Sequence, residues 1–194
     1  MSQKPDEDLI NKVIKGENNA YAILVDRYKH MVYTLALKIV KNREDAEEVA
    51  QDSFIKAYNA LNDFKGESKF STWLYKIVYY RSLDYLKKNK RQVETTAIDI
   101  SEEYNIASMD DALDRMEVKE RTEIIKHAIE KLPADDAVLI TLYYFETLSM
   151  NEISKVMEIP ANTIKVRLFR GRKRLAKILE NNLELENIQS YGRE

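Results

Sequence analysis

Apolar residues return at steps of three and four along most of the chain, which is the spacing of one face of an α-helix. In the amino-terminal half the clearest stripe consists of Leu24, Val25, Tyr28, Met31, Val32, Leu35 and Ile39. A second inner face consists of Ala46, Val49, Ala50, Phe54, Ala57 and Leu61. Asn42 is suited to cap the helix that carries this second face, with Asp45 at its third position. The pattern predicts a bundle of helices.

A turn and a third long helix complete this part of the chain. The segment from Lys65 to Ser68 has the composition of a turn. Ser71 or Thr72 is expected to open the third helix, which runs to about Asn89. We therefore predict a first domain over residues 1–92. Residues 93–117 are acidic and have only a weak apolar rhythm, so we predict that they form a flexible linker.

The second half predicts a helix-turn-helix. Helical spacing resumes at Val118 and stops at Pro133, and a further helix is expected from about Ala134 to Tyr144. Ser149, with Glu152 three residues on, predicts a capping box for a short helix over residues 150–157. The segment from Glu158 to Pro160 breaks that helix. Asn162 is then expected to cap a basic helix with a buried stripe of Ile164, Leu168, Gly171 and Leu175. We place this second domain at residues 118–182 and a tail at 183–194.

The residue composition limits the classes of function that the chain can have. The chain has 194 residues, with four Gly and three Pro, which favours an all-α fold of two small domains. It has no cysteine, so disulfides and thiolate metal sites are excluded. His30 and His127 are isolated, and no nucleophile motif or phosphate loop is present, so we expect neither an enzyme nor a cofactor or metal. A polar amino terminus and the lack of a long apolar run predict a cytoplasmic protein without membrane insertion.

Charge is sorted along the chain, although the net charge is only −2. Residues 76–91 contain six basic residues and one acid, and residues 160–179 contain seven basic residues and no acid. Between these blocks, residues 94–120 contain nine acids and two basic residues. A basic run by itself is more often a solvated helix face. Here the second block coincides with the predicted helix-turn-helix, so DNA binding is favoured.

Two sets of motifs, in order, carry a family resemblance. The first set is Asp45-Ala46-Glu47-Glu48-Val49-Ala50-Gln51-Asp52-Ser53-Phe54, Phe64, Phe70-Ser71-Thr72-Trp73-Leu74-Tyr75-Lys76-Ile77 and Asp84-Tyr85-Leu86. The second set is Leu132-Pro133, Leu148-Ser149-Met150-Asn151-Glu152-Ile153 and Thr163-Ile164-Lys165-Val166-Arg167-Leu168. The chain resembles the extracytoplasmic-function (ECF) sigma factors of bacterial RNA polymerase, region 2 in the first half and region 4 in the second. The resemblance covers nearly the whole chain.

The resemblance implies a sigma factor that binds core RNA polymerase and directs promoter-specific transcription initiation, in an envelope or stress response. It implies contact with the clamp helices of the largest polymerase subunit through Asp45, Glu48, Gln51 and Asp52, and with the polymerase flap. It implies that the −10 element is bound by Phe64, Lys69, Phe70, Lys76, Tyr80, Arg81, Asp84, Lys87 and Lys88. It implies that the −35 element is bound by Asn162, Thr163, Lys165, Val166, Arg167, Phe169, Arg170 and Lys173. An anti-sigma factor is a further expected partner, and a small-molecule substrate is not expected.

Three positions depart from the family pattern. Many members have Asn where Tyr80 stands and Ser where Val166 stands, so the promoter preference of relatives cannot be transferred. Glu158 stands where a turn glycine is common, and a left-handed backbone there would cost about 1 kcal/mol. A stand-alone helix-turn-helix regulator is the alternative reading, and it predicts tight binding of the isolated protein to duplex DNA. The acidic linker is expected to lie against the two basic helices in the free protein.

Overall fold

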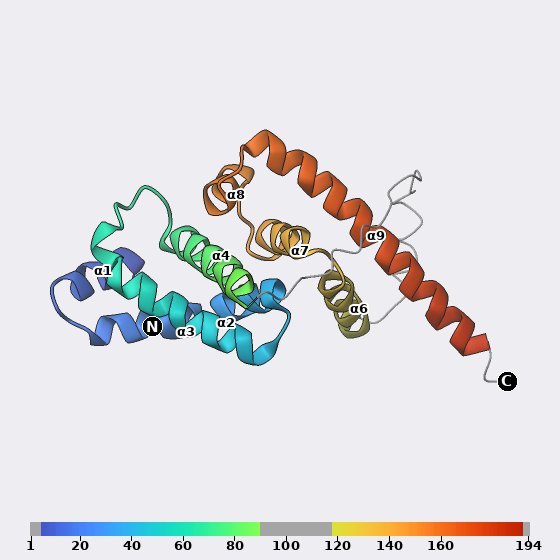
Figure 1. Ribbon diagram of the computed structural model, residues 1–194, viewed down its shortest axis with the longest axis horizontal. Coiled ribbons are helices and arrows are strands. Elements are labelled where there is room, and N and C mark those ends of the chain that lie inside the picture. Colours follow the sequence, from blue (N-terminus) through green and yellow to red (C-terminus); the bar gives the residue numbers. More distant parts are fainter. Residues whose placement is uncertain (1–4, 90–117, 192–194) are drawn as a thin grey trace. The chain divides into compact units, whose positions relative to one another are not determined.

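The computed structural model describes residues 5–89 and 118–191, and the side chains of the second stretch from residue 122 to residue 181. Every regular element in these residues is helical, as predicted from the sequence (Figure 1). The first stretch contains α1 (Asp6–Ile14), α2 (Asn19–Val40), α3 (Arg43–Asn59), the short 3₁₀ turn η1 (Leu61–Asp63) and α4 (Phe70–Lys88). The second contains α6 (Val118–Glu130), α7 (Ala134–Ile140), the π-turn η2 (Thr141–Phe145), α8 (Met150–Met157) and α9 (Ala161–Tyr191).

The contacts divide the chain into two compact units. One is made of Met1–Val93 together with Leu148–Ala161, and the other of Glu94–Thr147 together with Asn162–Glu194. Helix α8 therefore packs with the first unit, against α4. The domain limits given by the sequence motifs remain a prediction, and the predicted linker over residues 93–117 lies outside the described residues.

The core of the first unit lies between α2, α3 and α4, which pack against one another in pairs (Figure 1). The predicted stripes supply it. Leu24, Val32, Leu35 and Ile39 of α2 are buried, as are Ala46, Val49, Ala57, Leu74 and Val78 of α3 and α4. Helix α1 adds Leu9 and Ile10 to this core. It is also fixed by Asp6, whose carboxylate accepts hydrogen bonds from Arg27 and Tyr28 of α2.

Local capping explains where the helices of the first unit begin. The side chain of Asn42 accepts a hydrogen bond from the backbone N–H of Asp45 at 3.0 Å, as its predicted role as a cap requires. The loop before α4 turns at Gly66, whose φ of +71° lies in the left-handed region that glycine tolerates best. Helix α4 begins at Phe70, one or two residues earlier than predicted.

The helix predicted from Ala134 to Tyr144 is not regular throughout. Helix α7 ends at Ile140 and continues as the wider turn η2. The hydroxyl of Thr141 donates to the carbonyl oxygen of Ala137 at 2.7 Å, a bond that competes with regular helix geometry. Val138, Leu139, Ile140 and Leu142 are nevertheless buried.

The ends of α8 follow the prediction, and the start of α9 does not. Ser149 and Glu152 form the reciprocal capping box, and α8 ends at Glu158 with a left-handed φ of +55°. Asn162 does not cap the next helix, because α9 already begins at Ala161, directly after Pro160. A proline at the entry has a fixed φ and no N–H to satisfy, so the helix can start two residues earlier than a cap at Asn162 would allow. The Asn162 side chain instead accepts from the N–H of Thr163 at 2.8 Å.

Candidate nucleic-acid and polymerase interfaces

The amino-terminal end of α4 carries an aromatic cluster. Phe70 is buried, and its ring centroid lies 5.9 Å from that of Phe64 and 5.7 Å from that of Trp73. Phe64 and Trp73 are half-buried, and their ring centroids lie 5.2 Å apart. Rings at these separations stabilise one another. Two of the predicted −10 residues, Phe64 and Phe70, are thus brought together with Trp73.

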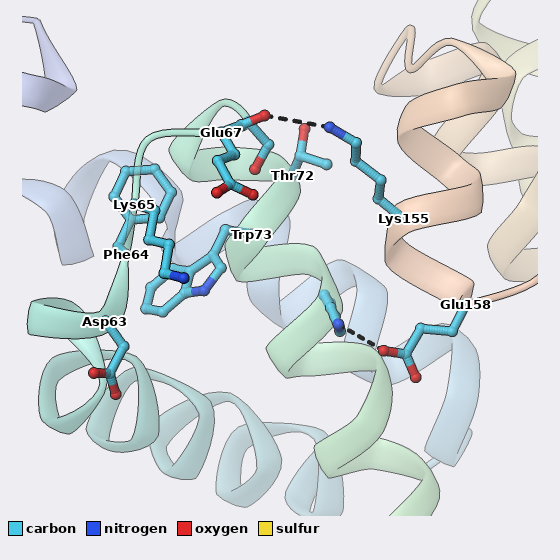
Figure 2. Close-up of a pocket in the computed structure, with 10 residues that line it drawn as sticks. Asp63, Phe64, Lys65, Glu67, Thr72, Trp73, Lys155 and Glu158 are labelled. Carbon is cyan, nitrogen blue, oxygen red and sulfur yellow. Dashed lines mark hydrogen bonds and ion pairs between the residues drawn. The ribbon is translucent and has the colours of Figure 1, made fainter.

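A cavity of about 430 Å³ opens beside this cluster (Figure 2). Its wall consists of Asp63, Phe64, Lys65, Glu67, Ser68, Thr72, Trp73, Lys76, Lys155 and Glu158. The hydroxyl of Thr72 is buried and has no hydrogen-bond partner among the described residues. The cavity combines aromatic faces with the ammonium groups of lysines.

The outer face of α4 carries most of the other predicted −10 residues. Lys87, Lys88 and Asp84 are exposed, and Lys76, Tyr80 and Arg81 are half-buried. Arg81 is paired with Asp52 of α3, one of the residues expected to contact polymerase. A residue of the predicted DNA surface is therefore tied to a residue of the predicted polymerase surface.

Helix α8 covers part of this face. Glu158 accepts a hydrogen bond from the Tyr80 hydroxyl at 2.6 Å, and its other carboxylate oxygen lies 2.6 Å from the Nζ atom of Lys76. At the other end of α8, Glu152 lies 3.5 Å from the Nζ atom of Lys69. Between them, Lys155 donates to the backbone carbonyl of Glu67 at 3.2 Å (Figure 2). We call Glu152, Lys155 and Glu158 the α8 cover.

The pKa values of the side chains in these contacts shift in the directions that the hydrogen bonds predict. The hydrogen bond from Lys76, followed by that from Tyr80, lowers the pKa of Glu158 below its usual value. Burial, followed by the bond to Glu158, raises the pKa of Tyr80 to about 12. The bonds from Ser149 lower the pKa of Glu152. Both glutamates are therefore ionised at neutral pH, and Tyr80 remains a hydrogen-bond donor.

The expected polymerase surface on α3 is only partly exposed. Glu48 and Gln51 are exposed, and Asp52 is half-buried through its pair with Arg81. Asp45 is only 8% exposed, so this member of the expected polymerase set does not lie on the exposed face of α3. Its carboxylate instead accepts a hydrogen bond at 2.9 Å from the hydroxyl of Tyr85 on α4. Asp45 therefore joins α3 to α4.

The predicted −35 residues lie on the first turns of α9. Ile164 and Leu168 are buried, whereas Lys165, Val166, Phe169 and Arg170 are exposed and Thr163 is half-buried. The Nζ atom of Lys173 lies 5.0 Å from the ring centroid of Phe169. Of the predicted buried stripe, Ile164, Leu168 and Gly171 are buried and Leu175 is half-buried, and the basic face is present.

Two acids of α7 hold arginines of α9, which the sequence motifs did not indicate. Asp135 lies 3.5 Å from Arg167, an exposed pair. Asp136 is 7% exposed and is paired with Arg174. Close packing supports this pair, because a Cβ on Gly171 would lie 3.7 Å from the Asp136 side chain. Acid and arginine are 32 to 38 residues apart in the chain, so spacing alone could not reveal them.

The described residues contain neither a candidate membrane span nor a candidate metal site. No helix there has both the length and the apolar character that a membrane crossing requires. Likewise, the described part of the chain holds no group of three or more His, Cys, Asp or Glu side chains placed to bind a metal ion.

Comparisons with known proteins agree with this arrangement. The family model of Sigma-70 region 2 matches residues 24–92, and that of Sigma-70 region 4 matches residues 122–175. The RNA polymerase sigma-H factor of Pseudomonas aeruginosa is 33% identical over 187 residues, which cover 93% of this chain and 96% of the relative. The ECF RNA polymerase sigma-E factor of Escherichia coli K12 is 36% identical over 177 residues, with 88% and 92% covered.

Two solved structures have a similar fold. The structure of CnrH in complex with the cytosolic domain of CnrY has a TM-score of 0.62 at 21% identity, covering 91% of this chain and 97% of that one. The sigma factor RpoE in complex with the anti-sigma factor NepR from Bartonella quintana has a TM-score of 0.60 at 22% identity, covering 87% and 98%. At these identities the likeness concerns the fold.

The two helical regions, each with its own family match, define an RNA polymerase sigma factor of the sigma-70 type. Within that class, the chain belongs to the ECF sigma factors, as its full-length relatives do. It binds core RNA polymerase and directs promoter-specific, DNA-templated transcription initiation. The family expectation from the sequence motifs is confirmed, and the stand-alone regulator is not favoured.

Proposed function

We propose that the loop before α4 and the first turns of α4 read the −10 element by holding an unstacked base in the cavity beside Trp73. The main observation in support is the cavity itself, with its aromatic and lysine lining. Aromatic faces stack on bases of any type, and Lys65 and Lys76 are placed to neutralise the adjoining phosphates.

The test uses holoenzyme reconstituted with core polymerase, which first selects a strand from a library of randomised single-stranded DNA. Phe64→Ala should weaken binding of the selected strand by about 1–3 kcal/mol, the value of one stacked base. Tyr58→Ala is the control, because Tyr58 is an exposed aromatic on α3 that does not line the cavity. Equal binding by the Phe64 variant and wild type would refute base capture here.

The proposal extends to the −35 element and the polymerase. The exposed face of α9 is suited to the major groove, with Lys165, Val166 and Arg167 nearest its start and Arg170 and Lys173 further along. Glu48, Gln51 and Asp52 on α3 are suited to an electrostatically steered contact with the polymerase clamp.

A regulated role in the cytoplasm completes the proposal. Proteins of similar fold are known in complexes with an anti-sigma factor or a cytosolic domain, which supports an anti-sigma partner and an envelope or stress response for this chain. The test is co-purification with the tagged chain before and after envelope stress. A partner that is bound before stress and lost after it is expected, and core polymerase as the sole partner in both states would contradict regulation of this kind.

A further inference from the structure

The α8 cover places carboxylates on residues that the proposed function assigns to DNA. Glu158 bonds to both Lys76 and Tyr80, and Glu152 lies beside Lys69. All three α4-side residues belong to the predicted −10 set. A carboxylate offers an ammonium group the same negative charge and acceptor oxygens as a phosphate does. The contacts therefore resemble those that a DNA backbone would make on the same face.

The cover is held in place by its own helix. In the capping box one Glu152 oxygen accepts from the N–H of Ser149 at 2.9 Å, and the other oxygen reaches Lys69. Glu158 lies at the left-handed end of α8, and the Ser154 hydroxyl donates to the carbonyl of Ile159 at 2.6 Å just beyond it. Both ends of a short helix are thus fixed, so the spacing of the two carboxylates is fixed as well.

Glu158 has a left-handed backbone, and its side chain makes two contacts with α4. Its φ of +55° is a conformation that glycine adopts at lower cost than a residue with a side chain. Glycine could make neither the bond to Tyr80 nor the pair with Lys76. The side chain found at this position is one that closes the cavity wall on the α8 side.

We propose that α4 carries an acid-binding surface whose resident partner is α8 of the same chain, and that promoter DNA must displace α8 to reach the −10 residues. This inference rests on the proposed function of α4. The ion pairs are exposed, so each is weak and salt-sensitive, and a DNA strand can exchange with them. Three residues join α8 to α9, so displacement of α8 also moves the start of the predicted −35 reader.

The acidic linker over residues 93–117, which is expected to lie against the basic helices, is outside the described residues. Within the described residues, the acids paired with Lys69 and Lys76 are Glu152 of α8 and Glu158 at its C-terminal cap.

The experiment measures the α8 position and DNA binding in the full-length chain. Because the chain has no cysteine, Asn59→Cys on α3 and Asn151→Cys on α8 give two unique, exposed sites for spin labels. The label-to-label distance is measured by double electron–electron resonance. Binding of a short fluorescein-labelled single-stranded DNA of randomised sequence is measured by anisotropy at low and high salt.

The test variant is Glu152→Gln with Glu158→Gln. Glutamine preserves the capping box and the shape of both side chains while it removes their charge. We expect a broadened, longer distance distribution and about tenfold tighter DNA binding at low salt, the effect of two exposed ion pairs of ordinary strength. Adding the DNA probe to the wild-type chain should broaden the distribution in the same way.

The control is Glu44→Gln with Glu146→Gln, which changes the net charge equally at exposed or half-exposed positions that are not part of the α8 cover. Equal gains in affinity for both double variants would show a bulk charge effect and overturn the inference. An unchanged distance in the test variant would also overturn it. Phe64→Ala, added to the test variant, separates the two claims. If it weakens DNA binding while the glutamates have no effect, only the cover is wrong, and if it has no effect, the −10 function of α4 is wrong.

Discussion

Asp136 and Asp135 are neighbours in α7 with opposite surroundings, and they provide a matched pair for mutation. Asp136 is buried with Arg174, so Asp136→Ala leaves a partly buried guanidinium without its carboxylate. We expect a loss of about 3 kcal/mol in the stability of the second unit. Asp135→Ala removes only the exposed pair with Arg167 and should cost less than about 1 kcal/mol.

Urea unfolding measures both effects. Trp73 is the only tryptophan, so its fluorescence reports on the first unit, whereas far-ultraviolet circular dichroism reports on all helices. Asp136→Ala should lower the midpoint of the dichroism signal and leave the fluorescence midpoint in place. Similar shifts for the two aspartate variants would mean that burial does not distinguish them.

Glu48 gives a cleaner test of the polymerase contact than the acids on either side of it. Asp45 is buried against Tyr85 and Asp52 is paired with Arg81, so replacing either would also disturb the bundle. Glu48→Lys reverses an exposed charge and should weaken core binding by at least tenfold while helicity is retained. Glu17→Lys, at an exposed site between α1 and α2, is the control, and normal core binding by the Glu48 variant would contradict the assignment.

At the residue scale the sequence predicted local backbone features better than it predicted which side chains are buried. The cap at Asn42 and the left-handed backbone at Glu158 were anticipated because each depends on a few neighbouring residues. The burial of Asp45 was missed because its partner, Tyr85, lies 40 residues away on another helix. A motif position carries a family role, but it does not show whether that side chain reaches solvent.

At the scale of elements, we expect residues at the start of α9 to set base preference and residues further along it to contact the DNA backbone. Lys165 lies on the exposed face of its first turns, where side chains can approach base edges, so Lys165→Ala should change the preferred −35 sequence. Lys173 lies two turns later beside Phe169, and Lys173→Ala should weaken binding uniformly. Its slope of log affinity against log salt should fall by about 0.9. Holoenzyme binding to a panel of promoter variants measures both, and the same profile for the two variants would contradict this division.

Helix boundaries were predictable wherever a cap or a proline set them. The capping box of α8 is an example, because it needs only Ser149 and Glu152. Pro133 and Pro160 also mark helix entries, although Pro160 starts α9 earlier than the predicted cap at Asn162. The π-turn at Thr141–Phe145 was missed because the apolar pattern is nearly the same on a helix and on a wider turn. Packing, and the Thr141 hydroxyl, decide between them.

At the scale of the whole molecule, motif order was sufficient to indicate the family, while the contact between α4 and α8 was not foreseen. Glu158 and Tyr80 are 78 residues apart, and both charge signs occur throughout the chain. Only the departure from glycine at Glu158 marked the site in advance. The contact links the proposed −10 surface to the helix that precedes the proposed −35 reader.

We propose that this sigma factor reads a promoter in two blocks, the −10 element with α4 and the −35 element with α9. The most direct measurement is transcription by core polymerase, with and without the protein, on templates randomised across the promoter, followed by sequencing of transcript 5′ ends and their upstream DNA. The wild-type protein should enrich two separated sequence blocks. Lys165→Ala should alter only the upstream block, and Phe64→Ala should weaken only the block nearer the start. No protein-dependent 5′ ends, or identical blocks for the wild-type protein and both variants, would contradict the account.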